Sequence, residues 1–387
     1  MSDVGTAVPP TTAPSGPKDR RGSWIPTFSM ISTRFMELRR RRGLMIVLIV
    51  VNIGIPSVFL AIRLIAHAVA PKSYGPAGGY VIYTALVAGV MYIFGFIVAA
   101  TLGCTAGSVD LTEGMFRHLV VTGRSRLALY LARIPAGLAI IVPLVAAGFA
   151  IVCAVCTLAA PTTLSYDGAT VPAGLSLSGF ESWAGAHADL VLCDLPSDGR
   201  LAVNIPCGPN GPVSIKRGPV GTAPTPALTP PSRAALSAEA VRIAKQDYAD
   251  YSDHFLSPSV SLMIKSGLWI ELEAAIGLIV GLGLASLLGQ RTVSVILMIV
   301  LELVLTPILS TAHIAHLINL QRGLVGLATA HLEPASLPVP FGGGGGGAVH
   351  RASQLVPESI PVAICVVVAW LVGWSAIGAW RMMTRDA

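Results

Sequence analysis

The sequence has little charge and few aromatic side chains for its length. Charged residues make up 12% and aromatic residues 6% of the 387 positions, whereas hydrophobic residues make up 53%. A typical globular chain carries about 25% charged residues, and a soluble fold of this size could not cover its surface with so few. Several uncharged runs reach the roughly 20 residues that span a bilayer. The composition therefore predicts a polytopic membrane protein and excludes a cytosolic enzyme, a secreted disulfide scaffold and a wholly disordered chain.

The sequence also lacks a nucleotide-binding loop and a recognisable metal site. No G-x-x-x-x-G-K-[ST] segment occurs, and the dipeptide Gly-Lys is absent, so no loop of this type can hold the phosphates of ATP. His313 and His316 are three positions apart, but no zincin Glu accompanies them, and His331 and Glu333 add no recognisable ligand spacing. We therefore predict no catalytic residue, cofactor site or metal site on this chain.

Positive charge is concentrated where the chain first meets the membrane. The sequence holds 26 Lys and Arg against 20 Asp and Glu, and eight of these basic residues precede residue 43. Because the cluster adjoins the first apolar run, it favours anionic lipid headgroups over nucleic acid as its partner. It also predicts a cytoplasmic N-terminus, since Lys and Arg beside a span stay on the inner side.

Six apolar runs predict six transmembrane helices. We expect these helices over residues 44–64, 80–103, 134–160, 268–289, 292–310 and 359–380. The short segments on the resulting inner side hold 15 Lys and Arg and the two short outer loops hold four, so both termini are predicted to be cytoplasmic. The excess of Arg over Lys, 21 to 5, indicates a GC-rich bacterial genome, and the expected location is the bacterial inner membrane. The predicted fold class is an all-α polytopic membrane protein.

The N-terminal part before the first span divides into two segments. Residues 1–26 are rich in Pro, Thr, Ser and Gly, which predicts a disordered cytoplasmic tail. Residues 27–43 show apolar side chains at helical spacing, which predicts an amphipathic helix lying in the inner interface. The expected apolar stripe is Phe28, Ile31, Phe35 and Leu38, and the expected polar side is Thr33, Arg34, Glu37, Arg40 and Arg41.

The remaining chain divides into two groups of three spans, 44–160 and 266–387, separated by a predicted extracytoplasmic insert at 161–265. The insert has one predicted helix at 232–251, begun by Pro231 and Ser232. Its two cysteines, Cys193 and Cys207, lie in an oxidising compartment under this topology, and we predict a disulfide between them. The polar segment 311–358, which includes Glu333 on the predicted outer side, is either re-entrant or an outer loop.

The segment between the second and third spans carries the most informative pattern. It contains Asp110-Leu-Thr-Glu113-Gly114-Met115-Phe-Arg117, then Gly123-Arg124-Ser125-Arg126, and later Arg133. An acidic residue before Gly, a Gly turn, Ser-Arg and a basic residue before the next span resemble ABC-2-type ABC transporter permeases. The interfacial helix, the six spans, the tight turn after the fourth span and the polar segment after the fifth are similar to that family. The resemblance covers residues 27–135 and 266–380; Met115, where Thr is common, and the long insert depart from the pattern.

The resemblance implies the permease subunit of an ATP-driven exporter. Two ATPase subunits would bind ATP and Mg beneath the membrane, and a second permease, identical or different, would complete the complex. The expected cargo is a hydrophobic or amphipathic molecule, such as a drug, a lipid or a lipid-linked glycan. When the ATPases close, their motion would be transmitted to this chain through charged residues on its inner side, which are suited to form salt bridges with them. The alternative is that these residues only fix topology and cap helices. The residues concerned are Asp110, Glu113, Gly114, Arg117, Arg124 and Arg126.

Two features inside the predicted spans add further hypotheses. Glu302 lies ten residues into the fifth span, where a carboxylate is energetically unfavourable. A functional role would make it a point on the translocation path or a latch between spans. The alternative is a protonated or hydrogen-bonded structural residue. Glu271 and Glu273 are expected nearer the outer interface, within reach of water. Gly277-x-x-x-Gly281 gives the fourth span a face of small residues for close packing, within the subunit or across a dimer.

Two other classes of function remain open on the sequence alone. One is a non-transporting membrane scaffold or sensor whose outer insert binds a ligand or a protein. The other is an intramembrane enzyme that uses Glu302 and the histidines. An associated Walker-type ATPase would favour the exporter, its absence would favour the scaffold, and an activity abolished by a chelator would favour the enzyme.

Overall fold

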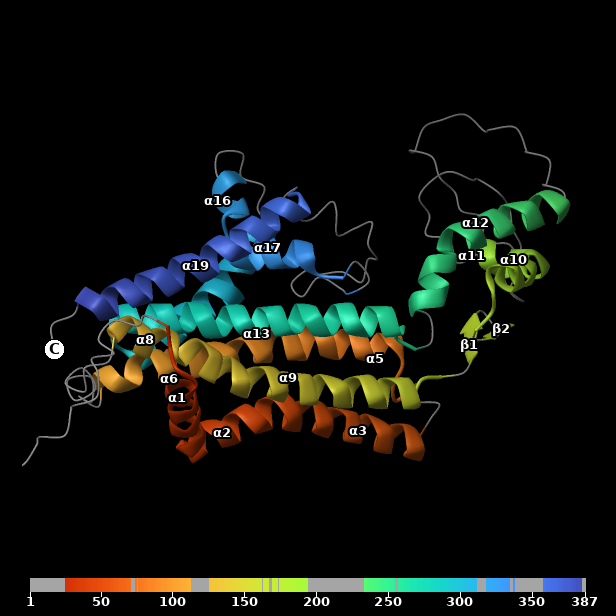
Figure 1. Ribbon diagram of the computed structural model, residues 1–387. Helices are drawn as coiled ribbons and strands as arrows, with labels where there is room; N and C mark the ends of the chain where they lie inside the picture. Colours follow the sequence, from red (N-terminus) through yellow and green to blue (C-terminus); the bar gives the residue numbers. More distant parts are fainter. Residues whose placement is uncertain are drawn as a thin grey trace, which may run out of the picture.

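The computed structural model describes residues 25–70, 74, 76–112, 125–161, 163–166, 169–172, 174–193, 233–254, 257–311, 318–334, 337 and 358–384. This part of the chain is mostly helical (Figure 1). Six helices are long and apolar enough to cross a membrane, as an all-α membrane protein requires: Arg42–Val69, Tyr80–Val109, Arg126–Leu158, Val260–Leu288, Arg291–Leu309 and Ile360–Thr384. Each coincides with one of the six predicted spans. The third and fourth begin eight residues earlier than predicted, because helical hydrogen bonding continues past the apolar run into more polar sequence.

Four of the six long helices are assembled from shorter regular segments, and α13 and α19 are each continuous. Their bounds are α2 (Arg42–Ile49), η1 (Val50–Gly54), α3 (Ile55–Val69), α5 (Tyr80–Thr84), η2 (Ala85–Met91), α6 (Tyr92–Thr112), α8 (Arg126–Leu131), α9 (Arg133–Leu158), α13 (Val260–Leu288), α14 (Arg291–Ile299), η3 (Val300–Leu305), α15 (Thr306–Thr311) and α19 (Ile360–Thr384). The segments η1, η2 and η3 are π-helical, a wider winding that is often found at functional sites. The segment η1 ends at Gly54, two residues before Pro56 in the first turn of α3.

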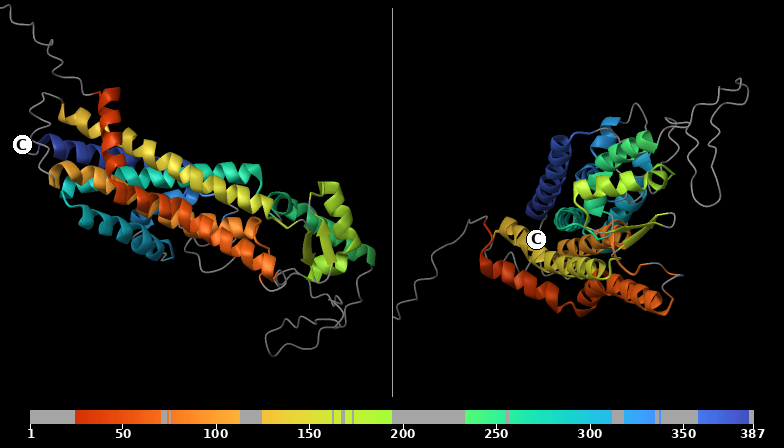
Figure 2. Two further views of the ribbon diagram at one scale, coloured as in Figure 1. Left: turned by 90° about the horizontal axis from the view of Figure 1, so that it is seen from below. Right: turned by 90° about the vertical axis from the view of Figure 1, so that its right-hand side faces the viewer.

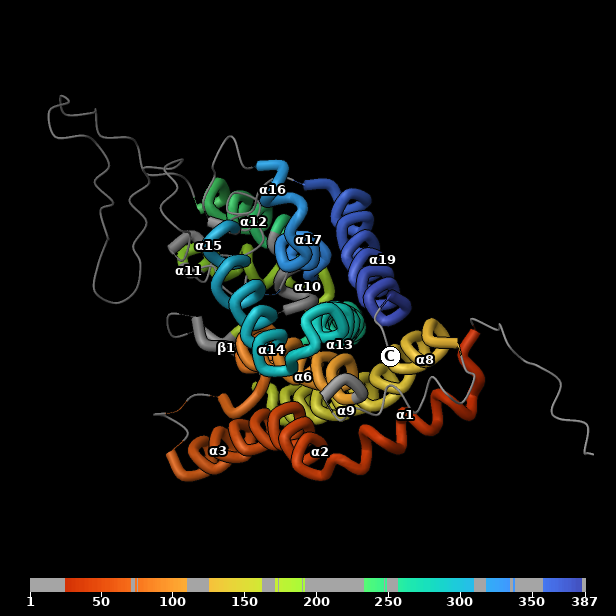
Figure 3. The backbone as a smooth tube through the Cα atoms, turned by 90° about the vertical axis from the view of Figure 1, so that its left-hand side faces the viewer, coloured from red at the N-terminus to blue at the C-terminus, as the bar shows by residue number. Residues whose placement is uncertain are grey.

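Helix α13 forms the centre of the bundle. Viewed along its length in Figure 3, it is surrounded by α6, α9, α14, α17 and α19. Its closest neighbour is α6, because Gly277 and Gly281 let the two backbones approach: a Cβ atom at Gly281 would lie 2.8 Å from the carbonyl oxygen of Ala100. Across another face, Gly283 lies against the backbone of Trp374 in α19. The small-residue face of the fourth span is therefore used for packing within the subunit.

The outer faces of the bundle remain apolar. Large hydrophobic side chains are exposed along α3, the fifth span and α19, among them Val58, Ile62, Ile65, Ile296, Val304, Val368 and Val372. A soluble protein rarely exposes continuous apolar surface on this scale. The hydrocarbon of a bilayer would cover such a surface without an energetic cost, in agreement with the predicted membrane location.

Helix α1 (Phe28–Arg40) lies across the end of the bundle (Figure 2), as an interfacial helix would. The predicted assignment of its faces is wrong in part. Met30, Arg34 and Leu38 are its buried residues, whereas Phe28 is 84% exposed. The reason is that α1 packs on α9. The face of α1 that contacts the protein therefore includes Arg34, and apolar side chains such as Phe28 remain on the surface, where they can contact lipid.

The turn between the fourth and fifth spans is as short as predicted. Helix α13 ends at Leu288, Gly289 adopts a left-handed conformation with φ 71°, and α14 begins at Arg291. Gly accepts this conformation without a steric cost and so closes the helix. The next polar segment contains α16 (Ile318–Arg322) and α17 (Val325–Leu332). Residues 325–329 of α17 are all buried, and α17 packs against α13, α15 and α19, so this segment lies among the spans, as the re-entrant alternative requires.

The segment between the third and fourth spans forms a small separate body at the far end of the bundle from α1 (Figure 1). It contains the antiparallel pair β1 (Thr163–Tyr166) and β2 (Ala169–Pro172), and the helices α10 (Leu177–Ala186), α11 (Ala188–Cys193) and α12 (Arg233–His254). Helix α12 confirms the predicted helix at 232–251. It packs on α10 and α11, where the Ser237 hydroxyl donates to the Gly185 carbonyl at 3.1 Å.

The predicted disulfide falls partly outside the described residues. Cys193 ends α11, and Cys207 lies outside them, so the pairing stays a prediction. The two cysteines are fourteen positions apart, and closing a loop of that size would contribute about 3 kcal/mol to local stability in the chain-entropy model. We expect mass spectrometry of alkylated, unreduced protein to recover one peptide linked through Cys193 and Cys207. Recovery of both as alkylated thiols would contradict the predicted disulfide.

Candidate functional site

The most unusual feature of the bundle is a group of buried acidic side chains contributed by separate segments. Glu273 lies on α13, Glu302 on η3 and Glu333 directly after α17, and they are 2%, 2% and 6% exposed. Their charges act on one another and on Tyr92, which begins α6 and is also buried. We call Tyr92, Glu273, Glu302 and Glu333 the carboxyl cluster. Buried ionisable groups inside predicted membrane spans are costly and mark a functional site by default.

The carboxylate of Glu302 is held on one side by Tyr92. The Tyr92 hydroxyl donates a hydrogen bond to Oε1 of Glu302 at 2.5 Å. The Tyr92 ring stacks on that of Trp269, with centroids 4.9 Å apart and planes 4° from parallel. Trp269 donates from Nε1 to the carbonyl oxygen of Thr329 in α17 at 3.1 Å. One connected set of contacts therefore joins α6, α13, η3 and α17 around Glu302.

The second oxygen of Glu302 faces a different environment. Oε2 is buried and has no hydrogen-bond partner in the part of the chain that the structure describes. The neighbouring hydroxyl, Thr306, lies beside this carboxyl group and also donates to the carbonyl oxygen of Leu301 at 3.0 Å, so its single proton is shared between the two. Gly326, in the first turn of α17, lies close to Oε2 of Glu302, since a Cβ atom added to Gly326 would be 2.7 Å from that oxygen.

Glu273 is similarly enclosed. Its Oε1 atom is buried and finds no hydrogen-bond partner among the described residues. Its hydroxyl neighbour, Thr329, donates to the carbonyl oxygen of Gly326 at 3.1 Å. The expectation that water reaches Glu273 is therefore wrong. Helix α13 begins at Val260 rather than near Leu268, so about 20 Å of helix lies between its first residue and Glu273, at 1.5 Å per residue.

The cluster lies well inside the length of the spans. Glu302 is eleven residues beyond Arg291, the start of α14, which places it about 16 Å along the fifth span. Because the hydrocarbon core of a bilayer is about 30 Å thick, this depth corresponds to its middle. The prediction that Glu302 is a mid-span carboxylate agrees with this position, and the structure adds Glu273 and Glu333 as its neighbours.

A further buried carboxyl lies just before the last span. Oε2 of Glu358 is 3.8 Å from Nδ1 of His331, whose ring also lies 2.8 Å from the Leu327 carbonyl oxygen. Burial raises the pKa of Glu358 above its usual value, while His331 and Arg322 oppose that shift. Among the described residues, no group of three or more His, Cys, Asp or Glu has an arrangement that could hold a metal ion; His313 and His316 lie outside them.

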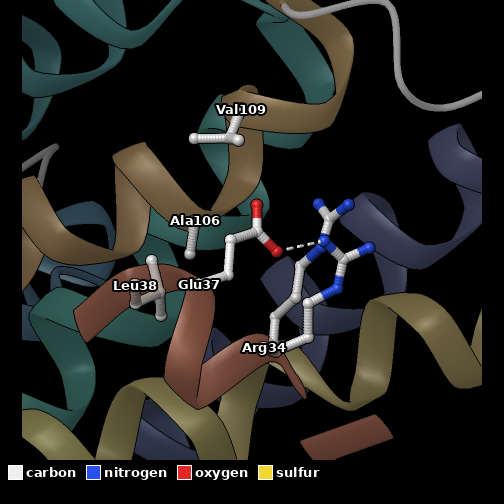
Figure 4. Close-up of a pocket in the computed structure, with 6 residues that line it drawn as sticks. Arg34, Glu37, Leu38, Ala106 and Val109 are labelled. Atoms are coloured by element: carbon white, nitrogen blue, oxygen red, sulfur yellow. Dashed lines mark hydrogen bonds and ion pairs between the residues drawn. The ribbon is translucent and has the colours of Figure 1, made fainter. Parts of the chain in front are cut away.

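A second polar site joins α1 to the spans at the end of the bundle. Arg34 donates to Glu37 at 2.7 Å on α1, and both line a small pocket with Leu38, Ala106, Val109 and Arg133 (Figure 4). The buried Arg133 side chain, at the start of α9, donates to the Gly107 carbonyl oxygen at 3.3 Å. Helix α1, the last turns of α6 and the start of α9 therefore lie close together at this site.

The predicted coupling residues lie around a gap in the described chain. Glu113, Gly114, Arg117 and Arg124 fall outside the described residues, and only the backbone of Asp110 is described, within α6. Arg126 begins α8 and donates from Nη1 to the carbonyl oxygen of Met383 near the end of α19, at 3.2 Å. Both borders of the undescribed segment 113–124 are therefore attached to other helices, through α1 on one side and α19 on the other.

Comparisons with protein-family models, with curated proteins and with solved structures find no match for this chain. Function must therefore be argued from the two polar sites themselves.

The sequence pointed to Glu302 and missed the residues that surround it. Tyr92, Thr306 and Thr329 are ordinary members of apolar helices by sequence, and Glu333 was placed on the outer side. A carboxyl group in each of two adjacent spans is a signal that could have suggested pairing. Arg34, Glu37 and Arg133 were noted only as charges near a span, because nothing in their spacing indicates that they meet.

Proposed function

We propose that this protein is the permease subunit of an ATP-driven exporter of the ABC-2 type in a bacterial inner membrane. The observation that carries the proposal is the junction at the α1 end of the bundle. There α1 crosses the bundle and packs on α9, its Arg34 and Glu37 border the end of α6, and Arg126 joins the start of α8 to the end of α19. Basic residues concentrate at the same helix ends, which favours a cytoplasmic location.

This junction is suited to receive a mechanical input. The segment 113–124 connects α6 to α8, and both helices continue into long spans. A partner that moves this segment would act on the second and third spans together, and through the α1 and α19 contacts on the rest of the bundle. The sequence has no G-x-x-x-x-G-K-[ST] loop, and the proposal assigns the energy for such a motion to a separate ATPase.

Polar features inside the bundle support a transport role. Helix α17 and the carboxyl cluster lie among the spans, where the proposal places a transport path. The proposed cargo is hydrophobic or amphipathic, and two ATPase subunits and a second permease are the proposed partners.

The test is purification of the tagged full-length protein from its own membranes in mild detergent. We expect a chain containing G-x-x-x-x-G-K-[ST] to co-purify in a near-equimolar amount, and the complex to hydrolyse ATP. Mutation of the Walker lysine in that partner should remove hydrolysis, which distinguishes it from a contaminant. A complex without such a chain and without ATP hydrolysis would contradict the exporter proposal and favour the scaffold alternative.

A further inference from the structure

We propose that Glu273 and Glu302, with Glu333 beside them, form an intramembrane site that reversibly binds a proton. The ligand is the proton itself, and the site is distinct from the junction that carries the proposed function. The inference rests on how the two carboxyl groups are enclosed, and it holds whether or not an ATPase binds this chain.

The first argument is the shortage of compensating charge. Among the described residues, the side chains that act on Glu302 are Tyr92 from α6 and Thr306, and those that act on Glu273 are Glu302, Thr329 from α17 and Glu333. All of these partners are neutral or acidic at neutral pH, since Tyr carries no charge there. Neighbouring carboxylates in a buried site cannot all be ionised, so the group holds at least one proton.

The second argument is that one carboxyl oxygen of Glu302 and one of Glu273 have surroundings that favour the protonated form. Oε2 of Glu302 and Oε1 of Glu273 are more than nine-tenths buried, inside the cluster, and neither has a hydrogen-bond partner among the described residues. The threonine beside each carboxyl also donates its single proton to a backbone carbonyl. A lone pair facing a carboxylate oxygen is repulsive, whereas the same lone pair accepts a hydrogen bond from a protonated carboxyl. Protonation would therefore supply the donor that each buried oxygen lacks.

The third argument is that the ionised form of Glu302 is also supported. Tyr92 donates to Oε1, and the first turn of the eight-residue helix α17 reaches Oε2 at Gly326. A helix N-terminus carries partial positive charge and favours an anion, whereas the opposite end, where Glu333 lies, disfavours one. Both protonation states of Glu302 thus have a local partner, which is the condition for reversible binding rather than for a permanently neutral residue.

A proton is the occupant that this packing accepts. It needs one carboxyl oxygen and no coordination shell, whereas a metal ion needs several ligands, and the described residues offer no group arranged for that purpose. An organic cation would need room, but the Gly326 backbone, the Tyr92 hydroxyl and the Thr306 side chain already contact the Glu302 carboxylate. The binding step is simple: a carboxylate oxygen accepts a proton from hydronium and water is released.

The experiment observes the carboxyl groups directly. The full-length protein is reconstituted in lipid nanodiscs without an ATPase, and infrared spectra are recorded while the buffer is titrated from acidic to alkaline. The readout is the C=O stretching band of a protonated carboxyl group in apolar surroundings. We expect wild type to show this band at neutral pH and to lose it reversibly under alkaline conditions. We expect Glu302→Gln and Glu273→Gln each to weaken the band, and the double variant to weaken it further, leaving only the contribution of the other buried carboxyl groups.

Two further variants serve as controls. Glu239→Gln removes an exposed carboxylate of α12 that is paired with Arg242, and it should leave the band unchanged. Tyr92→Phe keeps every carboxyl group but removes the donor to Glu302, so it should shift the frequency of the band even if the Gln variants fail to fold. The absence of a band in wild type at neutral pH, a band that does not respond to pH, or an unchanged band in folded double-Gln and Tyr92→Phe proteins would overturn the proposal. None of these outcomes bears on ATPase binding, so the exporter proposal is tested separately.

Discussion

Reversing the charge of Glu113 or Arg124 is expected to uncouple the protein from its ATPase while leaving the permease folded and inserted. Insertion depends on the apolar spans and on all the inner basic residues together, so one reversal should not change the topology. Loss of a partly buried charge contact at an interface costs about 2–5 kcal/mol, whereas a rim contact costs less. We therefore expect ATPase association to weaken by at least about tenfold, or about 1.4 kcal/mol, and stimulated turnover to fall with it.

The measurement compares Glu113→Lys and Arg124→Glu in the same reconstituted complex, with binding and ATP hydrolysis as readouts. The matched control is Glu181→Lys, a reversal on α10 in the body between the third and fourth spans. Glu333, which the sequence offered as an outer-side control, is unsuitable because it is buried beside Glu273. If the inner reversals and the control behave alike, the segment is only a topology signal, and the exporter assignment loses its strongest sequence support.

Gly281→Val is expected to destabilise the bundle strongly, whereas Gly373→Val should have little effect. A Cβ atom at Gly281 would lie 2.8 Å from the Ala100 carbonyl oxygen and 3.2 Å from Sγ of Cys104, while a Cβ atom at Gly373 would meet no heavy atom within 4 Å. Because the obstacle at Gly281 includes backbone, α13 and α6 must separate. Overpacking of this kind costs about 1–3 kcal/mol. The change in helix propensity is the same in both variants, so their difference isolates packing.

The buried Cys104 thiol provides the readout for this comparison. It lies in α6 at the contact with Gly281, and Cys365 is the exposed free cysteine on α19. In a background in which the other five cysteines are replaced by Ala, a thiol-reactive fluorophore should label Cys104 at a lower temperature in Gly281→Val than in the parent. Gly373→Val should unfold close to the parent temperature. Equal shifts in the two glycine variants would contradict the packing role of the small-residue face.

The sequence by itself determined the membrane class, the six spans and the short turn between the fourth and fifth. Each of these depends on local properties: the length of an uncharged run, the position of basic residues, and a glycine that can adopt positive φ at position 289. It also located Glu302 correctly within a span, because the position of a residue along an apolar run is given directly by the sequence.

The tertiary structure decided which polar groups meet. Glu302 is separated from Tyr92 by 210 positions along the chain, and neither the hydrophobic pattern of their helices nor their spacing records that contact. Packing likewise decided which face of α1 is buried. Arg34 is buried because α1 packs on α9, and its side chain donates a hydrogen bond to Glu37. Apolar periodicity specifies that a helix has two faces, but in a membrane protein both lipid and protein accept apolar side chains. Only the packed bundle therefore determines which face turns inward.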